Sequence, residues 1–308
     1  MATSASAETN SLRIVASIKP VHSLVTAITQ GVGEAELLMS TNQSPHHYSL
    51  RPSERRMLAN ADVIFWIGPN LESFMPRILE SLDDNSKAVA LIQTPGLKLL
   101  PIRSADHDHG EPGHAEDNDK NHADETPSHD EHAPDHFYTN IDAHIWLNTA
   151  NVETLIDAIT QRLIALDPEH QPQYLANSRQ LRIEVAQLRS ELQQSLNSVD
   201  TAFITYHDGY QYFENEFSLN NAGFVTSSEL QPGARRVSEL KQMIREQGID
   251  CIFYDAPVKP PLLKALLSEA EAGAFMLDPV GIFVEPGREA WFKIMRTMAN
   301  EFIHCRQQ

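Results

Sequence analysis

Three histidines that lie far apart in the sequence, His46, His144 and His207, could together bind one metal ion. Each lies beside a stretch that we predict to be a β-strand, close to its carboxyl end. Neutral imidazole is the commonest protein ligand of zinc. Because open α/β sheets bind ligands at the carboxyl ends of their strands, we predict that the three rings meet in one metal site.

Zinc takes four ligands at the corners of a tetrahedron, so three histidines leave one position to fill. Asp278 follows another predicted strand and could supply a carboxylate oxygen. His47 could turn inward, or a water molecule could complete the site. Asp208 and Asp255 are more typical of turns, or of hydrogen-bond partners for ligands, than of ligands themselves.

The segment at 103–136 combines histidines with acidic residues. It holds eleven Asp or Glu against one Arg and one Lys, which is a net charge of −9. It contains almost no large apolar side chain, so it cannot repay the entropy lost on ordering. We predict a disordered loop that binds further metal weakly; the alternative is a solvated acidic linker. Its seven histidines are His107, His109, His114, His122, His129, His132 and His136.

The composition of the whole chain limits the classes of function. Its 308 residues, 41% of them hydrophobic, can bury a sizeable core and form two lobes. The formal net charge of −18 argues against nucleic acid as a partner and suits a cation. No apolar run approaches the roughly 18 residues that span a bilayer, so we expect a soluble protein. The small, polar start at 1–8 is interpreted as the mature end left after removal of a signal peptide.

Strands alternate with helices along most of the chain, which predicts parallel sheets covered by helices on both faces. A long helix at 172–198 separates two such series, so we predict two α/β lobes at 11–168 and 199–308, joined by a linker region at 169–198. A single stiff helix there would limit hinge motion. The three histidines would then converge in the cleft between the lobes. Strands are predicted at 12–18, 35–39, 62–68, 88–92, 201–206, 224–225, 249–254 and 274–277, and a helix at 71–81.

The chain has two cysteines, Cys251 on a predicted strand and Cys305 in the last turn of a predicted helix. They form either one disulfide or two unrelated buried thiols. Enzymatic interpretations have less support, because Gly-x-Ser-x-Gly, His-Glu-x-x-His and P-loop motifs are all missing. A zinc hydrolase stays as an alternative, since three histidines and a water could form a hydrolytic centre. We expect a binding protein rather than an enzyme.

These motifs together resemble the zinc-specific, periplasmic substrate-binding proteins of bacterial ABC importers. The resemblance covers 14–305 and rests on 17–20, His46 with 48–53, the acidic His-rich insertion, 144–147, 207–210, 231–234, 277–279 and both cysteines. It implies two pseudo-symmetric, Rossmann-like lobes joined by a rigid helix, with Zn(II) bound in the cleft by His46, His144 and His207. It also implies a Cys251–Cys305 disulfide, a monomer in an oxidising periplasm, and delivery of zinc to a membrane permease.

The chain departs from these relatives at one place. Some zinc-type relatives have a glutamate immediately before the first ligand histidine, whereas this chain has Pro45, which offers no donor. Manganese-type relatives use an aspartate at the place of Asp278. They lack the His-rich insertion, however, and have an acidic residue at the place of His207. A manganese or iron importer component is therefore the alternative, and zinc is the expected cargo.

Overall fold

The structure is a computed structural model that describes residues 12–40, 43–103, 140–226, 232–255, 260–267 and 272–307. Of the acidic His-rich segment predicted at 103–136, only Arg103 is among the described residues. Its seven histidines lie outside them. No helix within the described ranges is long and apolar enough to cross a membrane.

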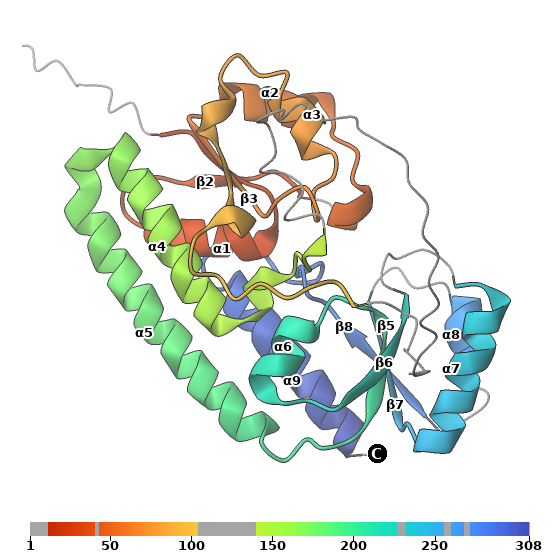
Figure 1. Ribbon diagram of the computed structural model, residues 1–308. Helices are drawn as coiled ribbons and strands as arrows, with labels where there is room; N and C mark the ends of the chain where they lie inside the picture. The colour runs from red at the N-terminus through yellow and green to blue at the C-terminus, as the bar shows by residue number, and fades with distance from the viewer. Residues whose placement is uncertain are drawn as a thin grey trace, which may run out of the picture.

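The first half of the chain forms a four-stranded parallel sheet in the order β2-β1-β3-β4, of which Figure 1 labels β2 and β3. Ile14 of β1 is in register with Ala35 of β2 and Val63 of β3. Every residue of β1 and β3 is buried, as expected for central parallel strands covered on both faces. The elements are β1 (Ile14–Ala16), α1 (Lys19–Ile28), β2 (Ala35–Leu37), α2 (Pro52–Asn60), β3 (Val63–Trp66), α3 (Met75–Leu79), β4 (Ala88–Ala90) and α4 (Thr149–Leu166).

The second half repeats this arrangement in a parallel sheet of order β6-β5-β7-β8. Because β5 and β7 take the places of β1 and β3, the prediction of two pseudo-symmetric lobes is confirmed. Phe203 of β5 is in register with Cys251 of β7. The elements are β5 (Phe203–His207), α6 (Gln211–Phe217), β6 (Asn221–Thr226), α7 (Ala234–Gln247), β7 (Cys251–Asp255), α8 (Pro260–Leu267), β8 (Gly273–Leu277) and α9 (Ala290–Arg306).

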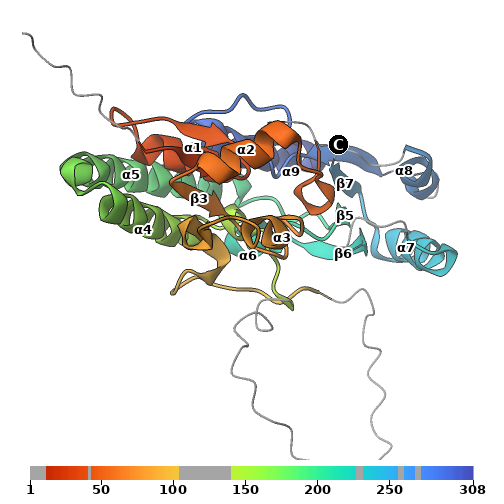
Figure 2. The same ribbon diagram turned by 90° about the horizontal axis from the view of Figure 1, so that it is seen from above.

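The predicted long helix is present as α5 (Gln171–Leu196), which has 26 residues and runs beside both lobes (Figure 1). Its apolar positions Leu181, Val185, Leu188 and Leu192 recur at steps of four and three, and all four are buried. This spacing places them on one face of the helix. The face packs against α1, α4 and α9, and Figure 2 shows α4 and α5 side by side.

The helix α9 forms a second junction between the lobes. It follows the last strand of the second lobe, yet it packs against α1 of the first lobe as well as α5. Trp291 Nε1 donates to the carbonyl oxygen of Trp146 at 2.9 Å, and Trp146 Nε1 donates to that of Pro279 at 2.8 Å. Both indoles are fully buried in a core shared by the two lobes. These bonds therefore hold the lobes together beside the long helix.

Two elements differ from the predictions. His144 does not lie at a strand end, because it precedes a one-turn 3₁₀ helix, Ile145–Leu147. The Asp142 carboxylate accepts the main-chain N–H of His144 at 3.0 Å and turns the chain there. The helix predicted at 71–81 is only Met75–Leu79, because Pro76 fits the first turn of a helix but not its interior.

Glu72 has a fully buried carboxyl group at the ends of β1 and β3. Its Oε1 accepts from Ser17 Oγ at 2.5 Å and from Ile67 N at 3.3 Å, and its Oε2 accepts from Gly68 N at 3.0 Å. Burial raises the pKa of Glu72 to about 7, although these hydrogen bonds oppose the shift. The side chain thus ties together the two central strands where they leave the sheet.

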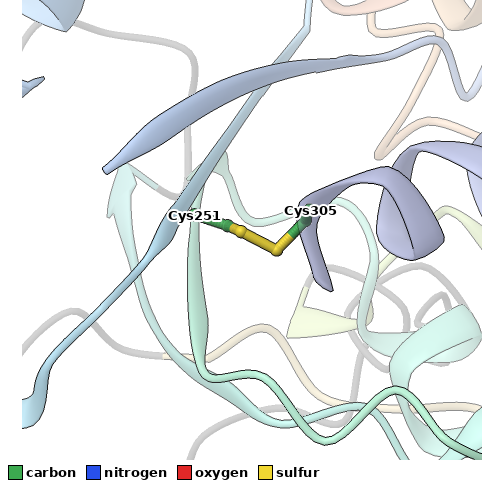
Figure 3. The surroundings of a disulfide bond; sticks show 2 residues. All are labelled: Cys251 and Cys305. Atoms are coloured by element: carbon green, nitrogen blue, oxygen red, sulfur yellow. A yellow bond between two sulfur atoms is a disulfide. The ribbon is translucent and has the colours of Figure 1, made fainter. Parts of the chain in front are cut away.

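A disulfide joins Cys251 of β7 to Cys305 of α9 (Figure 3). The two Cα atoms are 5.9 Å apart, and both residues are buried. The disulfide implied by the family resemblance is confirmed. It fastens the end of α9, which the two lobes share, to the second sheet.

We expect Cys251→Ala/Cys305→Ala to lower the free energy of unfolding by about 2–4 kcal/mol, because the open chain gains conformational entropy when unfolded. Urea denaturation with a metal chelator present measures this. Reductant should weaken the wild type by a similar amount and leave the double variant unchanged. A double variant as stable as the oxidised wild type would contradict a stabilising role for the disulfide.

Glu72→Gln should change how stability depends on pH. The folded protein keeps the Glu72 proton up to a pH of about 7, whereas an ordinary glutamate releases it near 4.5. Between these values the folded state binds more protons, so the free energy of unfolding falls as the pH rises. From pH 5 to pH 8 the wild type should lose roughly 2–3 kcal/mol relative to the variant.

Urea denaturation of metal-free protein from pH 5 to pH 8 gives the slope of the free energy of unfolding against pH for the wild type and for the variant. The comparison rests on slopes because the amide also changes the hydrogen bonds to Ser17 and Gly68. Parallel slopes for the two proteins would show that Glu72 is ionised throughout.

Candidate metal centre

The three predicted histidines meet between the lobes. The ring centroids of His46 and His144 are 5.6 Å apart, those of His46 and His207 5.5 Å, and those of His144 and His207 5.1 Å. One ring nitrogen from each can be chosen so that all three lie within 4.8 Å of one another. His46 and His144 come from the first lobe, and His207 is the last residue of β5 in the second. The predicted convergence in the cleft is therefore present.

His46 lies in a one-turn 3₁₀ helix, Pro45–His47, which follows β2. The Ser44 hydroxyl accepts the main-chain N–H of His46 at 3.3 Å and begins this turn, while Ser73 Oγ donates to the His46 carbonyl at 3.3 Å. Ser73 directly follows Glu72, whose carboxyl ties β1 to β3.

The imidazole of His46 is held neutral. Its Nε2 is buried and has no hydrogen-bond partner among the described residues. Burial, followed by the neighbouring His144, His207 and His47, lowers the pKa of His46 to about 2. A neutral ring keeps a lone pair on one nitrogen, and with the proton on Nδ1 the unpartnered Nε2 can give that lone pair to a metal ion.

His144 is oriented by Asp142. The His144 Nδ1 lies 2.6 Å from Asp142 Oδ1, and both residues are buried. Burial alone would raise the pKa of Asp142, but the charge of and hydrogen bonds from His144 lower it below its ordinary value. Because an ionised carboxylate only accepts, Nδ1 carries a proton, and in the neutral form of the ring Nε2 has the lone pair that a metal ion needs. Carboxylate–histidine pairs of this kind orient the ligands of zinc sites.

His207 has a similar partner and a close neighbour. Its Nδ1 lies 3.2 Å from Asp255 Oδ2, in agreement with the supporting role predicted for Asp255. Gly209 lies against the rings: a Cβ there would be 2.7 Å from His207 Cε1 and 3.0 Å from His144 Nε2. Only glycine lets the chain pass this close to both rings, a requirement that sequence reasoning missed although Gly209 follows the histidine by two residues.

Asp278, His47 and Asp208 lie near the site but are not within ligand distance of the three histidines. Asp278 lines a hollow with the three histidines, but its Oδ1 accepts from Ile282 N at 2.7 Å and its Oδ2 from Phe283 N at 3.0 Å. His47 is exposed and lines a second hollow, which the three histidines also line. Asp208 pairs with Arg103. Among the described residues, the group within ligand distance contains the three histidines alone.

Three neutral nitrogen donors favour zinc and similar transition metals over magnesium, calcium or manganese, which prefer oxygen ligands. The carboxylates of Asp142 and Asp255 stand behind two of the rings, where they increase the basicity of the imidazoles and offset the charge of a cation. The arrangement can therefore bind a divalent metal ion with three nitrogen ligands and one further ligand.

Comparisons with known proteins give one family. A family model described as "Zinc-uptake complex component A periplasmic" (ZnuA) matches residues 14–305. The high-affinity zinc uptake system protein ZnuA of Brucella abortus (strain 2308) is 35% identical over 303 residues, covering 95% of this chain and 91% of that protein. The protein of the same name from Yersinia pestis is 31% identical over 300 residues, covering 96% and 91%.

A crystal structure of ZnuA has the same fold. It matches with a TM-score of 0.74 and 21% sequence identity, and the match covers 95% of this chain and 100% of that chain. At this level of identity the likeness extends to the architecture of two lobes and a long helix.

Proposed function

The chain belongs to the ZnuA family of periplasmic zinc-uptake components, and from this membership we propose that its cleft captures one zinc ion and delivers it to the permease of an ABC importer. The observation that carries the proposal is the convergence of three imidazoles between the lobes. Their nitrogen donors suit zinc better than manganese, so a manganese or iron importer component is not favoured.

His46, His144 and His207 are the proposed zinc ligands, and water is the proposed fourth ligand. Asp278 lines the same hollow, but both of its oxygens already accept main-chain N–H groups of the loop that follows it. Turning this carboxylate toward the metal would break two hydrogen bonds to a charged group, each of which contributes about 1.5–3 kcal/mol. A water ligand has no such cost and is easily exchanged when zinc is released.

The protein works by binding rather than by catalysis in this proposal. ZnuA is a transport component, and zinc is its cargo. A zinc-bound water next to three histidines is also the arrangement of hydrolytic centres, so the hydrolase alternative has a simple test. An assay with ester and phosphoester substrates should give no turnover that a chelator removes.

The proposed location is the periplasm, after removal of a signal peptide. Members of this family are periplasmic, and the Cys251–Cys305 disulfide suits an oxidising compartment. The protein is proposed to act as a monomer, which sedimentation can test. The seven histidines predicted to bind further zinc weakly lie outside the described residues, and their role stays a prediction.

A zinc titration against a competing chelator tests the proposed site. The wild type and a variant lacking residues 104–135 should each bind one ion tightly, because the cleft histidines are intact in both. His207→Ala should bind far more weakly, by more than the roughly 10–100-fold lost with a supporting residue. His304→Ala is the matched control, since it removes an exposed imidazole of α9 and should leave tight binding unchanged.

Loss of tight binding in the deletion variant would contradict the proposal, because the primary site would then lie in the His-rich segment. Tight binding by His207→Ala would equally exclude the three-histidine site. A manganese titration under the same conditions should show much weaker binding than zinc.

A further inference from the structure

Two short stretches that flank the His-rich segment pair with each other, and we call residues 100–103 and 140–142 the stem. Pro101 forms an antiparallel bridge with Ile141. Ile102 N donates to the carbonyl of Asn140 at 3.0 Å, and Asp142 N donates to that of Leu100 at 2.9 Å. The stem therefore ends at Asp142, the residue that orients His144.

The stem is held against α6 of the second lobe. The Tyr212 hydroxyl accepts from Leu100 N at 3.0 Å and donates to the carbonyl of Asp142 at 2.9 Å. Gln211 Nε2 donates to the carbonyl of Pro101 at 3.0 Å. Both sides of the stem thus contact the lobe that carries His207, although the stem itself belongs to the first half of the chain.

Arg103 adds the charged part of this contact. Its Nε donates to the two carboxylate oxygens of Asp208 at 2.9 and 3.0 Å, and its Nη1 donates to Glu214 Oε2 at 2.8 Å. Both carboxylates are buried, and the guanidinium lies over the ring of Phe224 at 5.6 Å from its centroid. Burial opposes the charge of Arg103, but Asp208 and Glu214 raise its pKa, so it remains a cation between two buried anions.

We propose that Arg103 is a positioning residue for the three-histidine zinc site. It fixes Asp208, which directly follows His207, and it fixes the stem, which carries Asp142 and through it His144. One guanidinium therefore sets the distance between two ligands that come from different lobes. This inference rests on the proposed zinc-binding function.

The forked shape of the guanidinium matters for this role. Arginine can bridge two carboxylates with several donors in fixed directions, whereas lysine offers one compact charge on a flexible chain. A metal site also loses affinity when its ligands move by about 0.5 Å. Arg103→Lys should therefore keep the buried carboxylates neutralised and the protein folded, yet relax the geometry of the site.

The experiment compares Arg103→Lys and Arg103→Gln with the wild type. Zinc affinity comes from chelator competition, site geometry from the visible absorption spectrum of the protein loaded with Co²⁺, and stability from urea denaturation without metal. Arg296→Gln is the matched control: Arg296 also makes a bidentate pair, with Glu191 between α9 and α5, but away from the histidines.

We expect both Arg103 variants to lose about 10–100-fold in zinc affinity, as is typical for residues that orient metal ligands. Their Co²⁺ spectra should shift, and Arg103→Lys should do so while remaining folded. Arg296→Gln should stay within about twofold of the wild type. Zinc affinities within twofold and an unchanged Co²⁺ spectrum for Arg103→Lys would overturn the inference, even if Arg103→Gln unfolds. A wild type without tight zinc binding would instead overturn the proposed function.

Discussion

Three imidazoles must be held close together, tilted or edge-on to one another, by the protein alone, and the rest of the structure serves this constraint. One ring nitrogen of each lies within 4.8 Å of the other two, and a buried nitrogen without a hydrogen-bond partner among the described residues, such as Nε2 of His46, is costly. Hydrogen bonds to Asp142 and Asp255 fix two of the rings, and burial keeps His46 neutral. A bound cation would give the buried nitrogen of His46 a partner, so the close approach of the three rings favours metal binding.

Several contacts between the two lobes explain how ligands from both can be held so close together. The lobes share an apolar core, the long helix α5 packs beside both, and α9 is fastened to the first lobe by buried tryptophans and to the second by the disulfide. The contact between the stem and α6 includes Asp142, which orients His144. The lobes are thus joined at several places, of which the long helix is one.

The sequence predicts the order of strands and helices well, because fully buried parallel strands read as short apolar runs and α5 has a clear helical period. It also predicts which three histidines converge, since His46 follows the carboxyl end of one strand and His207 ends another. It fails at His144, because a run such as Ile145–Leu147 is equally apolar in a strand or in one helical turn. The roles of Arg103 and Gly209 depend on contacts between lobes, and Arg103 is 105 residues from Asp208. No local pattern contains that information.

The central claim is that the three histidines bind one zinc ion together, and X-ray absorption at the zinc edge tests it most directly. The sample is the variant lacking residues 104–135, loaded with one equivalent of zinc, so that six of the seven histidines of the His-rich segment are removed. We expect three imidazole nitrogens at about 2.0–2.1 Å and one oxygen ligand from water. A shell with fewer than three imidazoles, or one made mainly of carboxylate oxygens, would contradict it.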